Sequence, residues 1–305
     1  MAKSGVGGGG EKDWKEIDYG DLEIGPQIGG GGFAIVYKGA WKKRAVAIKA
    51  IFDPRVDDQV KKEFMDELLV MNQVQHKNIV TMIGACVRPP KLCIVLELAV
   101  NGSLHEVLHT RRVPLSEKQI VACARDTATG LAYLHGRSPG IIHRDIKSQN
   151  LLVTDDFTIK LCDFGLASTN VTAAGTPSYM APELLRSGLF SKQVDVYAFG
   201  VVMWEMVCRA VPFAGWDPLD IKSFVTDGKR LEVPRSGLPK PVLQLIERCW
   251  HEDPAKRPPI DKIARALDRV HRSMREVSHT QEMHLHAGGD SFDMLKSSVS
   301  SSRKK

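Results

Sequence analysis

The hydrophobic period changes once along this chain of 305 residues, and that change limits the folds open to it. Short segments rich in β-branched residues come first, at 22–28, 34–38, 45–51, 80–86 and 92–96. Among them, 57–75 carries Phe64, Leu68 and Met71 at helical spacing and predicts a helix. From Ser103 onward the pattern is mainly helical, at 116–134, 193–207, 217–226, 241–250 and 259–277. A sheet-rich lobe followed by a larger helical lobe is an α+β architecture, with the join near 97–102.

The two ends of the chain differ from this pattern. Residues 1–18 begin with a glycine-rich stretch, and residues 279–305 are rich in serine and end in basic residues. Segments with so little apolar surface do not fold on their own, so we expect flexible tails at both ends. The folded domain is then expected at 19–278, with the small lobe at about 19–98 and the large lobe at about 99–278.

Composition narrows the class of protein. A formal net charge of +6 is mild for this length, and we expect no nucleic-acid partner. The six cysteines are scattered, which is typical of reduced thiols in the cytosol. The longest apolar run, 196–204, is far shorter than the ~20 residues that span a bilayer. We therefore expect a cytoplasmic protein without a membrane span.

A polar stretch, HRDIKSQN at 143–150, is followed by DFG at 163–165. It combines two carboxylates, Asp145 and Asp163, with the Asn150 carboxamide and the Lys147 amine. One aspartate that orients a hydroxyl, an asparagine and a second aspartate that hold Mg²⁺, and a nearby lysine are the groups that phosphoryl transfer requires. The alternative, a solvated polar turn, does not explain the apolar residues that flank the stretch.

Two motifs of the small lobe, taken alone, are weaker indications of function than the polar stretch at 143–150. The loop IGGGGFAIV at 28–36 could cradle phosphate, but a bare glycine turn is about as plausible, and a dinucleotide-binding loop would be followed by a helix. In VAIK at 46–49, Lys49 ends a buried strand and needs a negative partner. Glu67 on the following helix is a candidate, with Glu63 and Asp66 as competitors.

The order of these motifs resembles that of eukaryotic protein kinases over about residues 19–275, because APE at 181–183 completes the series. The spacing of Phe64 and His76 around Glu67 is similar to that family and favours Glu67 as the partner of Lys49. DVYAFG at 195–200 and RCW at 248–250 resemble the tyrosine-kinase-like group, with Raf-like and mixed-lineage MAP kinase kinase kinases closest. The resemblance implies a bilobal protein-kinase fold.

The resemblance also implies the site residues and the cofactors, ATP and Mg²⁺. Catalysis would use Asp145, Lys147, Asn150 and Lys49, and the metal ligands would be Asn150 and Asp163. The nucleotide would be bound by Ile28, Gly29, Gly30, Gly31, Gly32, Phe33, Val36, Ala47, Lys49, Glu67, Leu96, Glu97, Ala99, Leu152, Cys162 and Asp163.

Some of these positions carry particular expectations. Leu96 would be the gatekeeper, and the backbone of Glu97 and Ala99 would bind adenine. Cys162 would face the nucleotide, and we expect a pocket-directed electrophile to alkylate it. Ala34 stands where the family has its third loop glycine, and this departure puts tight phosphate binding by the loop in doubt.

The segment GTPSYMAPE at 175–183, together with Lys147, resembles serine/threonine kinases. Thr176 would bond both Asp145 and Lys147. By the same resemblance, Asp195 would anchor the backbone of the 143–150 loop, and Glu183 would pair with Arg257.

Arg144 next to Asp145 indicates control by phosphorylation of the loop that precedes Glu183, with Thr172 as the favoured site. The modifying enzyme would be an upstream kinase or the chain itself.

We therefore expect a serine/threonine kinase that transfers the γ-phosphoryl group of Mg-ATP to a protein substrate, such as a downstream kinase in a signalling cascade. The alternative is a pseudokinase or weakly active scaffold, which the departure at Ala34 favours, although Lys49, Asp145, Asn150 and Asp163 are all present. A small-molecule phosphotransferase ranks last, because such enzymes lack the 176–183 segment.

Overall fold

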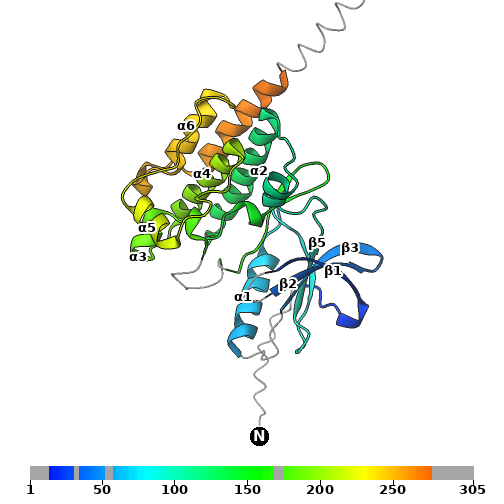
Figure 1. The fold of residues 1–305 in the computed structure, drawn as a ribbon. Helices are drawn as coiled ribbons and strands as arrows, with labels where there is room; N and C mark the ends of the chain where they lie inside the picture. Colours follow the sequence, from blue (N-terminus) through cyan, green and yellow to red (C-terminus); the bar gives the residue numbers. More distant parts are fainter. Residues whose placement is uncertain (1–13, 31–33, 52–57, 166, 168–174, 277–305) are drawn as a thin grey trace, which may run out of the picture.

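The computed structural model describes residues 14–30, 34–51, 58–165, 167 and 175–276 of the chain. These residues form two lobes, a sheet with one helix and a larger group of helices (Figure 1). The α+β architecture expected from the change of period is confirmed.

The small lobe is built on a five-stranded antiparallel sheet with the order β1-β2-β3-β5-β4. Its strands are β1 (Leu22–Gly30), β2 (Ala34–Trp41), β3 (Arg44–Ile51), β4 (Met82–Cys86) and β5 (Cys93–Glu97). Successive side chains of a strand point to opposite faces. In β3, Val46 and Ile48 are fully buried in a small core on one face, so Ala47 and Lys49 share the other.

Helix α1 (Asp58–Gln73) packs with Phe64, Leu68 and Met71 buried at helical spacing. Glu67 lies on the same face and is 6% exposed, whereas its competitors Glu63 and Asp66 are only half-buried. A buried carboxylate is costly without a cationic partner. This face therefore selects Glu67 as the acid that needs a partner inside the lobe.

The large lobe is formed by α2 (Glu117–His135), α3 (Pro182–Ser187), α4 (Lys192–Cys208), α5 (Pro218–Thr226), α6 (Lys240–Cys249) and a last helix at 260–276. Helix α4 is the central one, since its residues 194–206 are all buried. A helix that is apolar all round belongs in the middle of a bundle. Within the described ranges, no helix has both the length and the apolarity to cross a bilayer.

Two elements differ from the sequence prediction. The mainly helical interpretation missed the hairpin of β6 (Leu151–Val153) and β7 (Ile159–Leu161), whose strands are too short to show a period.

The expected tail boundary at residue 18 is also wrong. Residues 14–18 belong to the small lobe: Ile17 is 4% exposed and its N–H donates to the Ala85 carbonyl at 2.9 Å. The apolar Trp14 and Ile17 supply buried surface that the glycine-rich residues before them lack.

Candidate active site

Strand β3 and helix α1 direct Lys49 towards the residues that follow β7. Its Nζ lies 2.6 Å from Glu67 Oε1 and 2.9 Å from Asp163 Oδ1, although Asp163 is 114 residues away in the chain. The Lys49–Glu67 pairing predicted from the sequence is therefore present. The two contacts join the lobes through one ammonium group.

Charge and burial set the protonation of this group. Burial disfavours the Lys49 ammonium, but Glu67 and Asp163 outweigh that effect and raise the pKa of Lys49 above its ordinary value. Burial likewise favours a neutral Asp163, but the charge and hydrogen bond of Lys49 lower the pKa of that carboxyl. At neutral pH the site holds a charged Lys49 against a charged Asp163.

The loop 143–150 forms a second cluster around Asp145. Its Oδ2 is 2.7 Å from Lys147 Nζ and accepts a 2.9 Å hydrogen bond from Asn150 Nδ2. Lys147 also donates to Thr176 Oγ1 at 3.1 Å, which is one of the two bonds expected for Thr176; no bond to Asp145 is found among the described residues. The Asp145 side chain is held by two donors on one oxygen.

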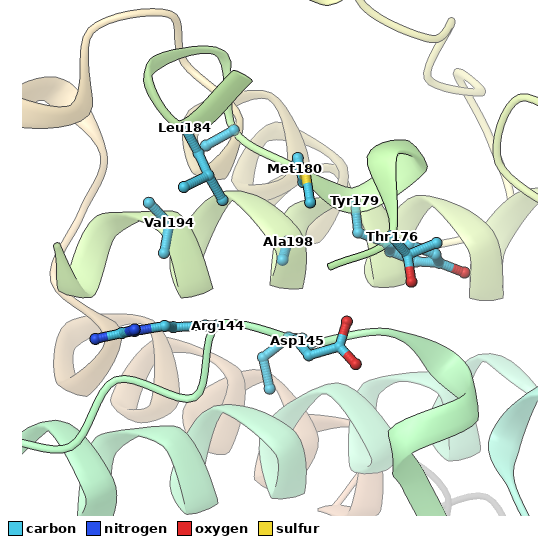
Figure 2. Close-up of a pocket in the computed structure, with 10 residues that line it drawn as sticks. Arg144, Asp145, Thr176, Tyr179, Met180, Leu184, Val194 and Ala198 are labelled. Atoms are coloured by element: carbon cyan, nitrogen blue, oxygen red, sulfur yellow. The ribbon is translucent and has the colours of Figure 1, made fainter. Parts of the chain in front are cut away.

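This cluster borders a small pocket between the loop and the 176–184 segment (Figure 2). The pocket is lined by Asp145 and Thr176 at one end and by apolar residues such as Leu184 and Val194 at the other. In Figure 2, Arg144 points away from the Asp145 carboxylate. The Arg144 guanidinium carbon lies 3.6 Å from the centre of the Phe190 ring.

The backbone of the 143–150 loop is held by hydrogen bonds to α4. The buried Asp195 carboxylate accepts hydrogen bonds of 2.8 Å from the backbone N–H groups of His143 and Arg144, and His135 Nε2 lies 2.8 Å from the same carboxylate. Arg144 adopts a positive φ of 67°, an uncommon conformation for a residue with a side chain. The expected anchoring role of Asp195 is confirmed.

The hairpin β6–β7 places Asn150 beside Asp163. Asn150 immediately precedes β6, and its carbonyl accepts a 3.0 Å bond from the N–H of Cys162, which follows β7. Sequence reasoning missed this hairpin; the apolar run 151–153 was the signal that could have found it.

The thiol of Cys162 is half-buried and donates to the Asn150 carbonyl at 3.4 Å. Burial, with the charge of Asp163, raises its pKa. The thiol is therefore held protonated, which counts against the ready alkylation expected from the sequence.

The other described residues that we expect around the nucleotide lie on strands of the two sheets or directly after them. Ala47 pairs with Leu96 across β3 and β5, and Val36 pairs with Gly29 and Lys49. Leu152 forms an isolated bridge with Ser103. Ile28 and Gly30 belong to β1, and Ala99 follows β5.

Glu97 carries contacts that sequence reasoning missed. Its Oε1 accepts a 2.6 Å hydrogen bond from the Thr81 N–H and lies 2.8 Å from Lys160 Nζ. These bonds connect the end of β5 to the residue before β4 and to β7, and so fix the segment between the lobes.

Some expected residues lie outside the described part of the chain. They are Gly31, Gly32 and Phe33 of the glycine-rich loop and the favoured phosphosite Thr172.

In the large lobe, Arg257 is fully buried and its guanidinium donates to both Glu183 carboxylate oxygens, at 2.7 and 2.8 Å. It also donates to the carbonyls of His251 and Gln193. The predicted Glu183–Arg257 pair is thus present, and it ties α3 to the loop before the last helix.

Comparison with known proteins assigns this arrangement to a family. The profile of the family described as protein tyrosine and serine/threonine kinase matches residues 22–267, and the chain belongs to this family.

Similar proteins indicate which group of the kinase family the chain resembles most. The chain is 41% identical to the serine/threonine-protein kinase CTR1 of Arabidopsis thaliana over 256 residues, which cover 81% of this chain and 31% of that protein. It is 40% identical to mitogen-activated protein kinase kinase kinase 10 of Mus musculus over 276 residues, 85% of this chain and 29% of that protein. It is 36% identical to the probable serine/threonine-protein kinase drkB of Dictyostelium discoideum over 265 residues, 85% of this chain and 38% of that protein. The chain spans well under half the length of each. The resemblance to Raf-like and mixed-lineage kinases is confirmed.

Proposed function

We propose that the chain is an active serine/threonine protein kinase that uses Mg-ATP and acts in a signalling cascade of the MAP kinase kinase kinase type. The observation that carries the proposal is the simultaneous contact of Lys49 with Glu67 and Asp163. A lysine so placed is charged and fixed at the junction of the lobes, as the binding of ATP phosphates requires.

The donor set fits the cofactors. Asn150 and Asp163 offer a carboxamide and a carboxylate oxygen, and hard oxygen ligands are those that Mg²⁺ prefers. We assign Asn150 and Asp163 to the metal and Lys49 to the phosphates. When bound, Mg-ATP supplies the phosphoryl group and neutralises charge on its oxygens.

Asp145 is assigned to the substrate hydroxyl. Among the described residues, Lys147 and Asn150 bind its Oδ2, so we assign Oδ1 to orient the hydroxyl and accept its proton. Lys147 lies where its charge offsets negative charge on the transferring group. Its bond to Thr176 holds it on the side where a peptide would lie.

The test is transfer of radiolabelled phosphate from ATP to generic protein substrates. We expect Asp145→Ala, Lys49→Met and Asp163→Ala each to lower the rate at least ~100-fold without unfolding the chain, since all three act on charge in the transition state. Lys62→Met and Asp155→Ala, at exposed positions, are the matched controls and should keep the wild-type rate.

The outcomes separate the alternatives. Activity of Lys49→Met or Asp163→Ala within about tenfold of wild type would contradict the assigned roles. Wild-type transfer no faster than that of Asp145→Ala would favour the pseudokinase scaffold. Phosphoserine and phosphothreonine in the product support the serine/threonine assignment, and phosphotyrosine alone would overturn it.

Control by phosphorylation at Thr172, with Arg144 as the partner of the phosphate, stays a proposal of the same kind. Mass spectrometry of active protein, before and after phosphatase treatment, tests it. Full activity without any phosphate on the loop would refute it.

A further inference from the structure

A compact group of metal-binding side chains lies outside the proposed active site. His105 and His109 lie on the short helical segment after the inter-lobe join, where 106–110 form a π-helical turn, and Glu205 projects from α4. His109 Nε2 is 2.8 Å and His105 Nδ1 is 3.7 Å from Glu205 Oε1. One donor atom from each residue lies within 4.8 Å of the others.

We propose that His105, His109 and Glu205 form a binding site for Zn²⁺. Two histidines four residues apart on one helical face, with a glutamate from another element, are a known ligand set for zinc with an open fourth position. Donor atoms around tetrahedral zinc lie about 3.3 Å apart, given bonds of roughly 2.0–2.1 Å. The separations of 2.8 and 3.7 Å from Glu205 bracket that value, so side-chain adjustments alone bring the three atoms onto one ion.

Burial and charge favour a cation at this place. The Glu205 side chain is wholly buried, whereas the His105 side chain is 28% exposed and leaves a route from solvent. The groups that contact Glu205 among the described residues are the imidazoles and the hydroxyls of Ser148 and Tyr179. A divalent ion beside this buried carboxylate would add an ionic partner to the hydrogen bonds that the carboxylate already accepts.

The same oxygen connects the zinc site to the catalytic loop. Ser148 Oγ donates to Glu205 Oε1 at 2.6 Å, and Tyr179 donates to Glu205 Oε2 at 2.9 Å. A metal on Oε1 would compete with Ser148, which lies between Lys147 and Asn150. We therefore expect zinc to slow phosphoryl transfer, a consequence that rests on the proposed function, whereas binding itself does not.

The test of binding is titration of the full chain with Co²⁺, in the presence of Mg²⁺, by visible absorption. We expect one equivalent to give the d–d bands of a tetrahedral site without thiolate charge transfer, and Zn²⁺ to displace it. His105→Asn and His109→Gln should each weaken binding at least ~10-fold, because loss of an outer-shell partner of a metal ligand already costs that much. His251→Gln, on a loop outside the cluster, is the matched control.

A measurement on the wild-type chain covers the case in which these variants fail to fold. Zn²⁺ should protect His105 and His109, but not His251, from acylation by diethyl pyrocarbonate, as followed by mass spectrometry. Absence of a saturable cobalt spectrum, an unchanged spectrum in the His variants, or equal acylation with and without zinc would each overturn the proposal. Binding without any change in kinase rate would refute only the link to the catalytic loop.

Discussion

Replacing Asp195 by asparagine tests how α4 holds the catalytic loop. The carboxylate accepts backbone hydrogen bonds on both oxygens, from His143 on Oδ2 and from Arg144 on Oδ1, each at 2.8 Å. Asparagine has nearly the same shape but only one oxygen. In either orientation of the amide, its NH₂ group would face a buried backbone N–H, and one donor would lose its acceptor.

The cost follows from these contacts. A hydrogen bond to a charged acceptor contributes about 1.5–3 kcal/mol, and a buried donor left without a partner costs a further ~1–3 kcal/mol, so we expect a loss of roughly 2.5–6 kcal/mol. For a domain of this size, ~1 kcal/mol lowers Tm by about 2–4 °C, so Tm should fall by at least about 5 °C. Displacement of the loop that carries Asp145 by ~1 Å should also slow phosphoryl transfer about 100-fold.

Differential scanning calorimetry and the kinase assay measure the two effects on the same preparation. The control is Asp261→Asn, because Asp261 forms an exposed helical pair with Arg265 that contributes little. If Asp195→Asn melted within about 2 °C of wild type and transferred phosphate within about twofold of the wild-type rate, the reasoning would be refuted.

Three further predictions concern burial and charge. Arg257→Ala should cost about 3–5 kcal/mol, because it leaves a carboxylate without its buried partner, whereas the exposed Arg265→Ala should cost under ~1 kcal/mol; equal Tm values in thermal melts would contradict this. Burial acts to raise the pKa of Glu97, but its hydrogen bonds with Lys160 and Thr81 outweigh burial and hold the pKa below its ordinary value. The stabilisation from these bonds is therefore present above about pH 4.3 and is lost as pH falls through the lower pKa of the folded state. The Tm of Glu97→Gln should vary less than that of wild type between about pH 6 and 3. Alkylation of Cys162 by a pocket-directed electrophile should be slow at neutral pH and should become faster as pH rises, because the raised pKa keeps the thiol protonated. An ATP analogue should block the alkylation, and Cys162→Ser should abolish it. Fast labelling with the ATP site occupied, as seen by mass spectrometry, would exclude access to the thiol through that site.

Much of the fold could be predicted from the sequence because periodicity is a local property. The expected helix 57–75 is observed as Asp58–Gln73, and the expected helix 193–207 as Lys192–Cys208. Elements of three residues, such as β6 and β7, have no measurable period and exist only because they pair with each other. The entry of Ile17 into the small core likewise depends on β4, which lies more than 60 residues further along the chain.

By itself the sequence determined which chemical groups are present and in what order, and this was enough to predict the kinase family. Tertiary structure decided which groups meet. Glu67, rather than Glu63 or Asp66, is turned into the lobe by the face on which α1 packs, and Lys49 reaches Asp163 only because the lobes close on each other. The contact of His109 with Glu205 joins residues 96 apart in the chain, and no sequence pattern indicates that these two residues meet. Periodicity records which face of an element is apolar, but the distance between side chains on different elements is set by how those faces pack.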